Sequence, residues 1–175
     1  MDIAQLFLQR YTVLYDFWLG GVWESVTAEQ MRLRPHPRVN SILWNLWHLT
    51  RVEDAGVNRF VDDQPQVLDA GGWMEKMDAP WRHLGGGMNF DEVDDLSRRI
   101  RIDALHDYAQ AVHARTLELA ARLAQIDLGE VVPPERVRAL VVDEGLAHSN
   151  PEGFIQNYIG WSKGKCLMNF ALTHP

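Results

Sequence analysis

Histidine is the residue type through which this sequence is best equipped to do chemistry, because neutral imidazole is a common metal ligand and titrates near neutral pH. Two of the seven histidines lie in apolar surroundings. His48 belongs to the run 43–49, Leu-Trp-Asn-Leu-Trp-His-Leu, and His174 shares a predicted helix face with Phe170 and Ala171. A charged imidazolium is costly there without a partner, so we expect a metal ion or a hydrogen bond at each ring. The alternative is a pair of core histidines whose nitrogens are satisfied by hydrogen bonds.

The other five histidines have simpler interpretations. Four are expected in loops or on a solvated helix face and have no predicted metal role: His36, His83, His106 and His148. His113 lies on the same predicted helix as His106 but can turn toward a neighbouring helix. It therefore stays open as a further ligand.

Three more residues near these histidines carry reactive or polar groups. Asn45 precedes His48 by three residues and could give the outer hydrogen bond that metal-bound histidines need, although a solvated side chain is favoured. Glu53 falls in an apolar stripe, so we expect it to pair with an arginine or complete a polar network rather than act as a base. Cys166 lies about 12 Å along the helix from His174 at 1.5 Å per residue. That is too far to share a metal, and Cys166 is predicted to be a small core residue.

Long helices must position these side chains. The first is predicted to run from the N-cap Asp2 to Leu19, before Gly20-Gly21, and the second from Ser41, capped by Asn40, to about Val61. Their apolar stripes, at spacings of three and four, are Leu6, Gln9, Val13, Leu14 and Phe17 in the first and Ile42, Leu46, Leu49, Glu53, Val57 and Phe60 in the second.

Two further long helices complete the prediction. The third runs from Asp103 to about Ala124, and the fourth begins at Asn150-Pro151-Glu152 and continues to the end of the chain, weakened by Gly160 and Gly164. The inward positions of the third helix are Leu105, Tyr108, Val112, Thr116, Leu119 and Leu123. Shorter helices are predicted from the capping box at 27–30 and over 91–99.

Two irregular stretches join these helices. Residues 62–89 form a long connection with several glycines and prolines, and connections of this length are uncommon in compact domains. Its large apolar side chains are predicted to pack against the helices, and a lid over a pocket is the less favoured role for two of them, Trp73 and Trp81. In the second stretch, 126–149, the run 138–142 is predicted to form a short strand or hairpin.

Composition favours one all-helical domain over residues 1–175, because 46% of the residues are hydrophobic and no strand–helix alternation is visible. The predicted fold is an antiparallel four-helix bundle. The net charge of −7, with basic residues scattered, argues against nucleic acid and anionic membranes as partners. There is no apolar run of the ~20 residues that span a bilayer and no N-terminal leader, and a single cysteine fits a reducing compartment. We therefore expect a cytoplasmic protein.

The run 44–54, Trp-Asn-Leu-Trp-His-Leu-Thr-Arg-Val-Glu-Asp, resembles the histidine-bearing helix of the DinB superfamily, a pattern also found in the N-terminal domain of ergothioneine-forming sulfoxide synthases. The last seven residues, Asn-Phe-Ala-Leu-Thr-His-Pro, fit as well, and the resemblance covers essentially the whole chain. It implies a four-helix bundle, often a homodimer, that holds a divalent metal with three histidines. His48 corresponds to the ligand on the second helix, and His174 to the first of a His-x-x-x-His pair on the fourth.

The sequence departs from that pattern at one point. The second histidine of the pair would stand at position 178, and the sequence given ends at Pro175. Three readings stay open: the natural protein is longer, the site is incomplete, or another group replaces the third ligand. Such a group could be His113, a residue of a second subunit, or water.

The resemblance also implies three kinds of function. The first is a metal-dependent thiol S-transferase or isomerase, in which Zn²⁺ or Ni²⁺ at His48 and His174 lowers the pKa of a low-molecular-weight thiol. The second is a non-catalytic protein that binds a metal or small molecule. The third is a structural or interaction bundle with an incomplete metal site.

Overall fold

The computed structural model describes residues 3–173, and every regular element in that range is helical. The one β-type contact among these residues is an isolated antiparallel bridge between Val131 and Ser162. The predicted all-helical class is therefore confirmed.

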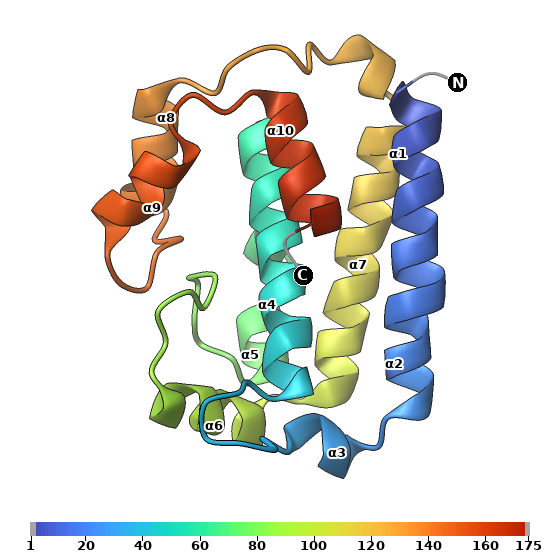
Figure 1. The fold of residues 1–175 in the computed structure, drawn as a ribbon, viewed down its shortest axis with the longest axis vertical. Coiled ribbons are helices and arrows are strands. Elements are labelled where there is room, and N and C mark those ends of the chain that lie inside the picture. The colour runs from blue at the N-terminus through green and yellow to red at the C-terminus, as the bar shows by residue number, and fades with distance from the viewer. Residues whose placement is uncertain (1–2, 174–175) are drawn as a thin grey trace.

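Four stretches of helix lie side by side along the long axis of the molecule (Figure 1). Three of them continue through a wider π-helical turn, labelled η1, η2 or η6. The stretches are α1 (Ile3–Thr12), η1 (Val13–Leu19) and α2 (Gly20–Ser25); α4 (Ile42–Ala55) and η2 (Gly56–Val61); α7 (Ile102–Ala120); and α10 (Lys163–Met168) and η6 (Asn169–Thr173).

The direction of these stretches explains the long connection. In Figure 1, α4 and α7 run the same way, whereas α1 and α10 run the opposite way. Because α4 and α7 are in contact, the chain must travel back along the molecule between them. That return passes through short elements: η3 (Val67–Asp69), α5 (Trp73–Met77) and α6 (Phe90–Arg99).

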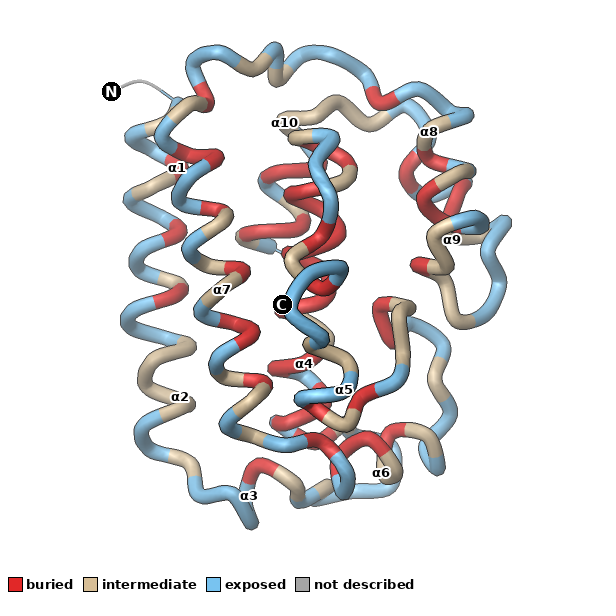
Figure 2. The backbone as a smooth tube through the Cα atoms, turned by 180° about the vertical axis from the view of Figure 1, so that it is seen from behind, coloured by how far each residue is buried: buried red, intermediate tan, exposed pale blue. Residues whose placement is uncertain are grey.

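Helix α4 is central and is buried on almost every side (Figure 2). Ser41 caps it by accepting a hydrogen bond from the Trp44 amide, one residue later than the predicted cap. A helix that is apolar all round belongs in a core. Its first half packs in one hydrophobic cluster with α6 and the start of α7, and its second half in another with α1, η2 and α10. All six inward positions predicted for the third helix are buried, five of them in α7 and Leu123 in η4 (Leu123–Gln125).

The first stretch buries a different face from the one predicted. Phe7 and Tyr11 are at most 2% exposed, whereas the predicted stripe is largely in solvent, with Leu6 43%, Val13 49% and Phe17 69% exposed. The buried face is aromatic and carries two polar tyrosine hydroxyls. These hydroxyls find buried acceptors, that of Tyr11 on α4 and that of Tyr15 on α7. The apolar row of Leu6, Val13 and Phe17 is left uncovered.

The long connection packs as predicted, with Met77 fully buried and the Trp73 ring 5.5 Å from that of Tyr108 on α7. The short strand or hairpin predicted at 138–142 was wrong. Those residues are helical, in the last turn of α8 (Pro134–Arg138) and in η5 (Ala139–Asp143). Pro134 at the first helical position starts this element, and Leu140 and Val141 are buried on one side of it.

The predicted fourth helix is two helices. Asn150 and Pro151 begin α9 (Pro151–Tyr158) as expected, but α9 ends before Gly160, whose φ of +80° is incompatible with a right-handed helix. Ser162 then caps α10. The break lets α9 pack beside α8 and η5 while α10 returns to lie against η2.

Candidate histidine site

His48 lies half-buried on α4 and is held on two sides. Its ring stacks on Trp44, with the centroids 4.6 Å apart, and its Nδ1 is hydrogen-bonded to the backbone carbonyl of Leu84. A carbonyl only accepts, so Nδ1 carries the proton and Nε2 carries the lone pair. In this tautomer a metal ion would be bound through Nε2, and an outer carbonyl is a usual partner of a metal-bound histidine.

Gly85 allows the Leu84 carbonyl to reach His48. Gly85 has a φ of +90°, and a Cβ atom there would lie 2.6 Å from the Trp47 ring and 3.2 Å from the Trp44 ring. Only glycine can therefore place the connection this close to α4. The Leu84 amide donates to the Leu146 carbonyl at 3.0 Å, which also ties the segment before α9 to this point.

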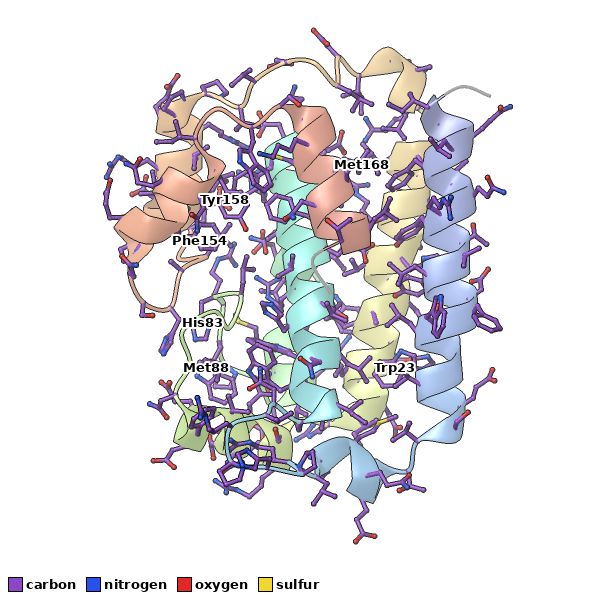
Figure 3. All side chains as sticks on the ribbon, in the orientation of Figure 1. Trp23, His83, Met88, Phe154, Tyr158 and Met168 are labelled. Atoms are coloured by element: carbon purple, nitrogen blue, oxygen red, sulfur yellow. The ribbon has the colours of Figure 1, made fainter. Side chains whose placement is uncertain are left out.

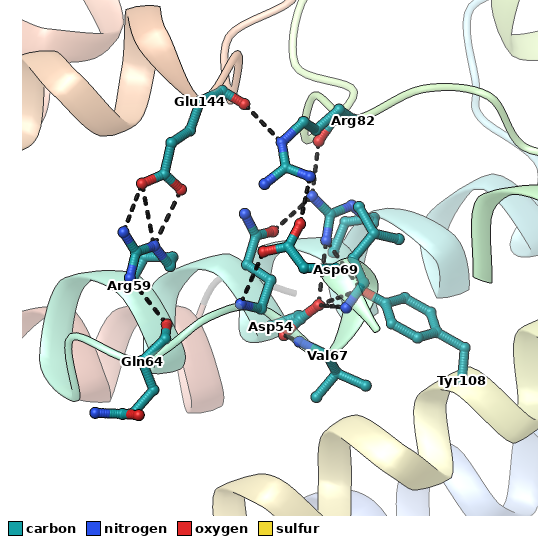
Figure 4. A network of polar contacts seen from close by, with 11 residues as sticks. Asp54, Arg59, Gln64, Val67, Asp69, Arg82, Tyr108 and Glu144 are labelled. Atoms are coloured by element: carbon teal, nitrogen blue, oxygen red, sulfur yellow. Dashed lines mark hydrogen bonds and ion pairs between the residues drawn. The ribbon is translucent and has the colours of Figure 1, made fainter. Parts of the chain in front are cut away.

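A buried ion pair one turn further along α4 fixes the rest of the connection (Figure 4). Arg51 and Asp54 are both fully buried, and the Asp54 carboxylate accepts from the backbone amides of Val67 at 2.7 Å and Leu68 at 2.9 Å. Arg51 donates to the Arg82 carbonyl at 2.7 Å. Arg51 and Asp54, opposite charges three residues apart in the run 44–54, were the sequence signal for this network, which was not predicted.

The same network continues outward to the segment after η5. Arg59 on η2 pairs with the Glu144 carboxylate at 2.6 Å, and the Arg82 guanidinium donates to the Glu144 carbonyl at 2.9 Å. The two irregular stretches of the chain are therefore joined to each other as well as to α4.

His174 lies outside the described residues. The last described helix, η6, contacts α4 and ends at Thr173. Phe170 stands directly against Gly56, where a Cβ atom would lie 2.1 Å from the phenylalanine ring. Within residues 3–173, no group of three His, Cys, Asp or Glu side chains is arranged to hold a metal ion.

Three other candidates have structural roles. Asn45 is exposed and donates to the Ser41 carbonyl at 3.0 Å. Cys166 is fully buried, and burial raises the pKa of its thiol to about 12, so it is an unreactive core residue as predicted. Trp73 lies in the connection's packing against α7, with Lys76 over its ring.

Glu53 completes a polar network, one of its two predicted roles. Its carboxyl accepts from the hydroxyls of Tyr11 on α1 and of Thr116 on α7, the latter at 2.6 Å. Burial is the main cause that raises the pKa of Glu53 to about 7. The two hydrogen bonds act to lower this pKa, and repulsion from Asp54 adds to the increase. His113 joins this network through Tyr11, at 3.0 Å, and stacks on Tyr15, so its ring lies between α7 and the first stretch.

Two histidines predicted to be unremarkable loop residues meet in the fold. His83, on the connection beside α4 (Figure 3), has its ring centroid 4.4 Å from that of His148, which pairs with Glu92 at 3.0 Å. Burial and the nearby His148 lower the pKa of His83 to about 4, so it is neutral at physiological pH. Three separate loop or helix-end positions form this cluster, and no spacing in the sequence indicated it.

Residues 3–173 define the class of this protein, an all-helical domain whose central, buried helix carries a half-buried histidine. Within it, this chain belongs to the DinB superfamily, whose family model matches residues 19–152. No curated protein matches the chain. Among residues 3–173, no helix is long and apolar enough to cross a bilayer.

Proposed function

We propose that this protein is a divalent-metal-binding DinB domain in which His48 and His174 hold the ion, and that the four stretches of helix form a four-helix bundle around it. The observation that carries the proposal is the Leu84 carbonyl on His48 Nδ1, which holds the ring so that Nε2 is the nitrogen that would bind a metal ion. The contact of η6 with α4 supports the assignment of His174, because the last described helix lies beside the helix that carries His48.

The chemistry we propose is thiol transfer or isomerisation with a small-molecule substrate. A Zn²⁺ or Ni²⁺ ion, when bound, would lower the pKa of a low-molecular-weight thiol so that a thiolate nucleophile forms at neutral pH. The chain's part is to orient His48 through Leu84 and Trp44, and to hold the connection against α4 through Arg51 and Asp54. A site that holds substrate groups in place lowers the entropic cost of reaction.

Metal content of the purified protein tests the assignment. We expect bound zinc or nickel by elemental analysis, and loss of most of it in His48→Ala and in His174→Ala, because a two- or three-histidine site loses its geometry when one ligand is removed. His36→Ala is the matched control, since His36 is an exposed loop histidine. Unchanged metal content in both ligand variants would overturn the proposal.

An activity assay distinguishes a thiol transferase from a non-catalytic binding protein. The metal-loaded protein is mixed with a low-molecular-weight thiol and a chromogenic aryl halide, and formation of the thioether is followed by absorbance. Metal-dependent conjugation that is lost in His48→Ala supports the transferase. Metal binding and thermal stabilisation without conjugation would instead support the non-catalytic alternative.

A further inference from the structure

A second candidate site, a groove lined in part by His106 and His113, has no role in the proposed metal chemistry. It has a volume of about 420 Å³ and lies between the first stretch and α7. Trp23 points into the space between α2 and α7 (Figure 3). The groove is lined by Tyr15, Asp16, Gly20, Trp23, Glu24, His106, Gln110 and His113.

The buried network decides which hydrogen-bonding group His113 presents. The Tyr11 hydroxyl has one proton and donates it to Glu53, so its oxygen must accept from His113 Nδ1. His113 Nε2 is then the acceptor nitrogen. Stacking on Tyr15, with the ring centroids 3.7 Å apart, and the contact with Tyr11 keep the imidazole in this orientation. The groove therefore has a fixed nitrogen acceptor in its wall.

The rest of the lining also favours a positive ligand. No lysine or arginine lines the groove, and two carboxylates do, those of Asp16 and Glu24. Neither carboxylate has an ion-pair partner within residues 3–173. The half-buried ring of Trp23 adds an aromatic surface, and aromatic faces attract cations.

We propose that this groove binds a small organic molecule with a primary ammonium group. The ammonium has three N–H donors, which match His113 Nε2 and the Asp16 carboxylate, and the organic part lies against Trp23. A volume of about 420 Å³ is within the range of small-ligand pockets, roughly 300–1,000 Å³. This site is separate from His48 and does not rest on the proposed metal function.

Three ligands of one shape test the charge preference. Phenethylammonium, its neutral counterpart 2-phenylethanol and the anion 3-phenylpropanoate are titrated into the intact protein, and binding is followed by calorimetry and by the NMR signals of His113 and Trp23. We expect the ammonium to bind at least about tenfold more tightly than the alcohol, because a charge-assisted hydrogen bond is stronger than a neutral one. Equal binding of all three, or no binding of the ammonium, would overturn the proposal.

Variants locate the binding in the groove. Asp16→Asn changes an exposed side chain and should weaken ammonium binding about tenfold while leaving binding of the alcohol unchanged. His113→Phe keeps an aromatic ring against Tyr15 and removes the acceptor, and its fold is checked by circular dichroism. Glu135→Gln, an exposed carboxylate outside the groove, controls for the change in net charge. If Glu135→Gln weakens binding as much as Asp16→Asn, the attraction is nonspecific and the proposal fails.

Discussion

Two neighbouring carboxyl groups on α4, Glu53 and Asp54, are buried in different ways. Asp54 is paired with Arg51 and accepts from two backbone amides, so its charge is compensated. Among residues 3–173, the hydrogen-bond donors to Glu53 are two hydroxyls, those of Tyr11 and Thr116. Burial without a cation raises its pKa from the ordinary value of 4.5 to about 7. At the scale of single residues, Glu53 is therefore a group whose protonation is linked to folding.

The sign of this linkage gives a prediction for Glu53→Gln. The folded protein holds the Glu53 proton between pH 4.5 and 7, where the unfolded chain has lost it, so the free energy of unfolding falls as pH rises through that window. The loss should be about 3 kcal/mol at about 1.4 kcal/mol per pKa unit. Glu53→Gln should remove this part of the pH dependence, measured by urea unfolding at several pH values.

Glu135→Gln, which changes an exposed carboxyl group, is the control for this measurement. It should retain the wild-type pH dependence. A Glu53→Gln protein whose stability still falls by the same amount between these pH values would show that another group is responsible.

At the scale of elements, the connection 62–89 is positioned by groups on α4. The Asp54 carboxylate accepts hydrogen bonds from the two amides at the start of η3, and Arg51 donates to the Arg82 carbonyl. The Leu84 carbonyl is hydrogen-bonded to His48. The sequence predicted where this connection begins and ends and that its apolar side chains pack. It did not predict its course, because backbone carbonyls and amides carry no sequence signal and their partners are 13 to 36 residues away.

We predict that Asp54→Ala destabilises the protein by about 3–5 kcal/mol, because it leaves the buried Arg51 charge and two backbone amides without their acceptor. The amides of Val67 and Leu68 should lose protection from hydrogen exchange more than those of α7. Asp107→Ala, an exposed aspartate on α7, is the control and should change stability by less than about 1 kcal/mol. If the amides of Val67 and Leu68 are as well protected from hydrogen exchange in Asp54→Ala as in the wild type, Asp54 does not anchor the connection.

At the scale of the whole molecule, the uncovered apolar row on the first stretch has a consequence for assembly. Leu6, Val13 and Phe17 lie at spacings of seven and four on one face, and Trp18 beside them is 62% exposed. Contiguous exposed apolar side chains of this size are typical of interaction surfaces. We propose that a second copy of the chain covers this row, which agrees with the homodimer that the family resemblance implies.

Phe17→Glu should then convert a dimer into a monomer, with the dissociation constant raised at least about thirtyfold, since a central aromatic at an interface contributes about 2 kcal/mol or more. Sedimentation equilibrium measures this directly. Leu33→Glu, which charges another apolar residue that is 61% exposed, should leave the mass unchanged. A monomeric wild-type protein would rule the dimer out.

The sequence by itself determined the helical class, most helix starts, the buried face of α7 and the resemblance that the family match confirms, because caps, prolines and apolar periodicity act over a few neighbouring residues. Only the tertiary structure decided which face of α1 is buried, where the fourth helix breaks, and what His48 and Glu53 contact. Those outcomes depend on groups distant in the chain, whose hydrogen bonds and burial exist only once the helices are packed together.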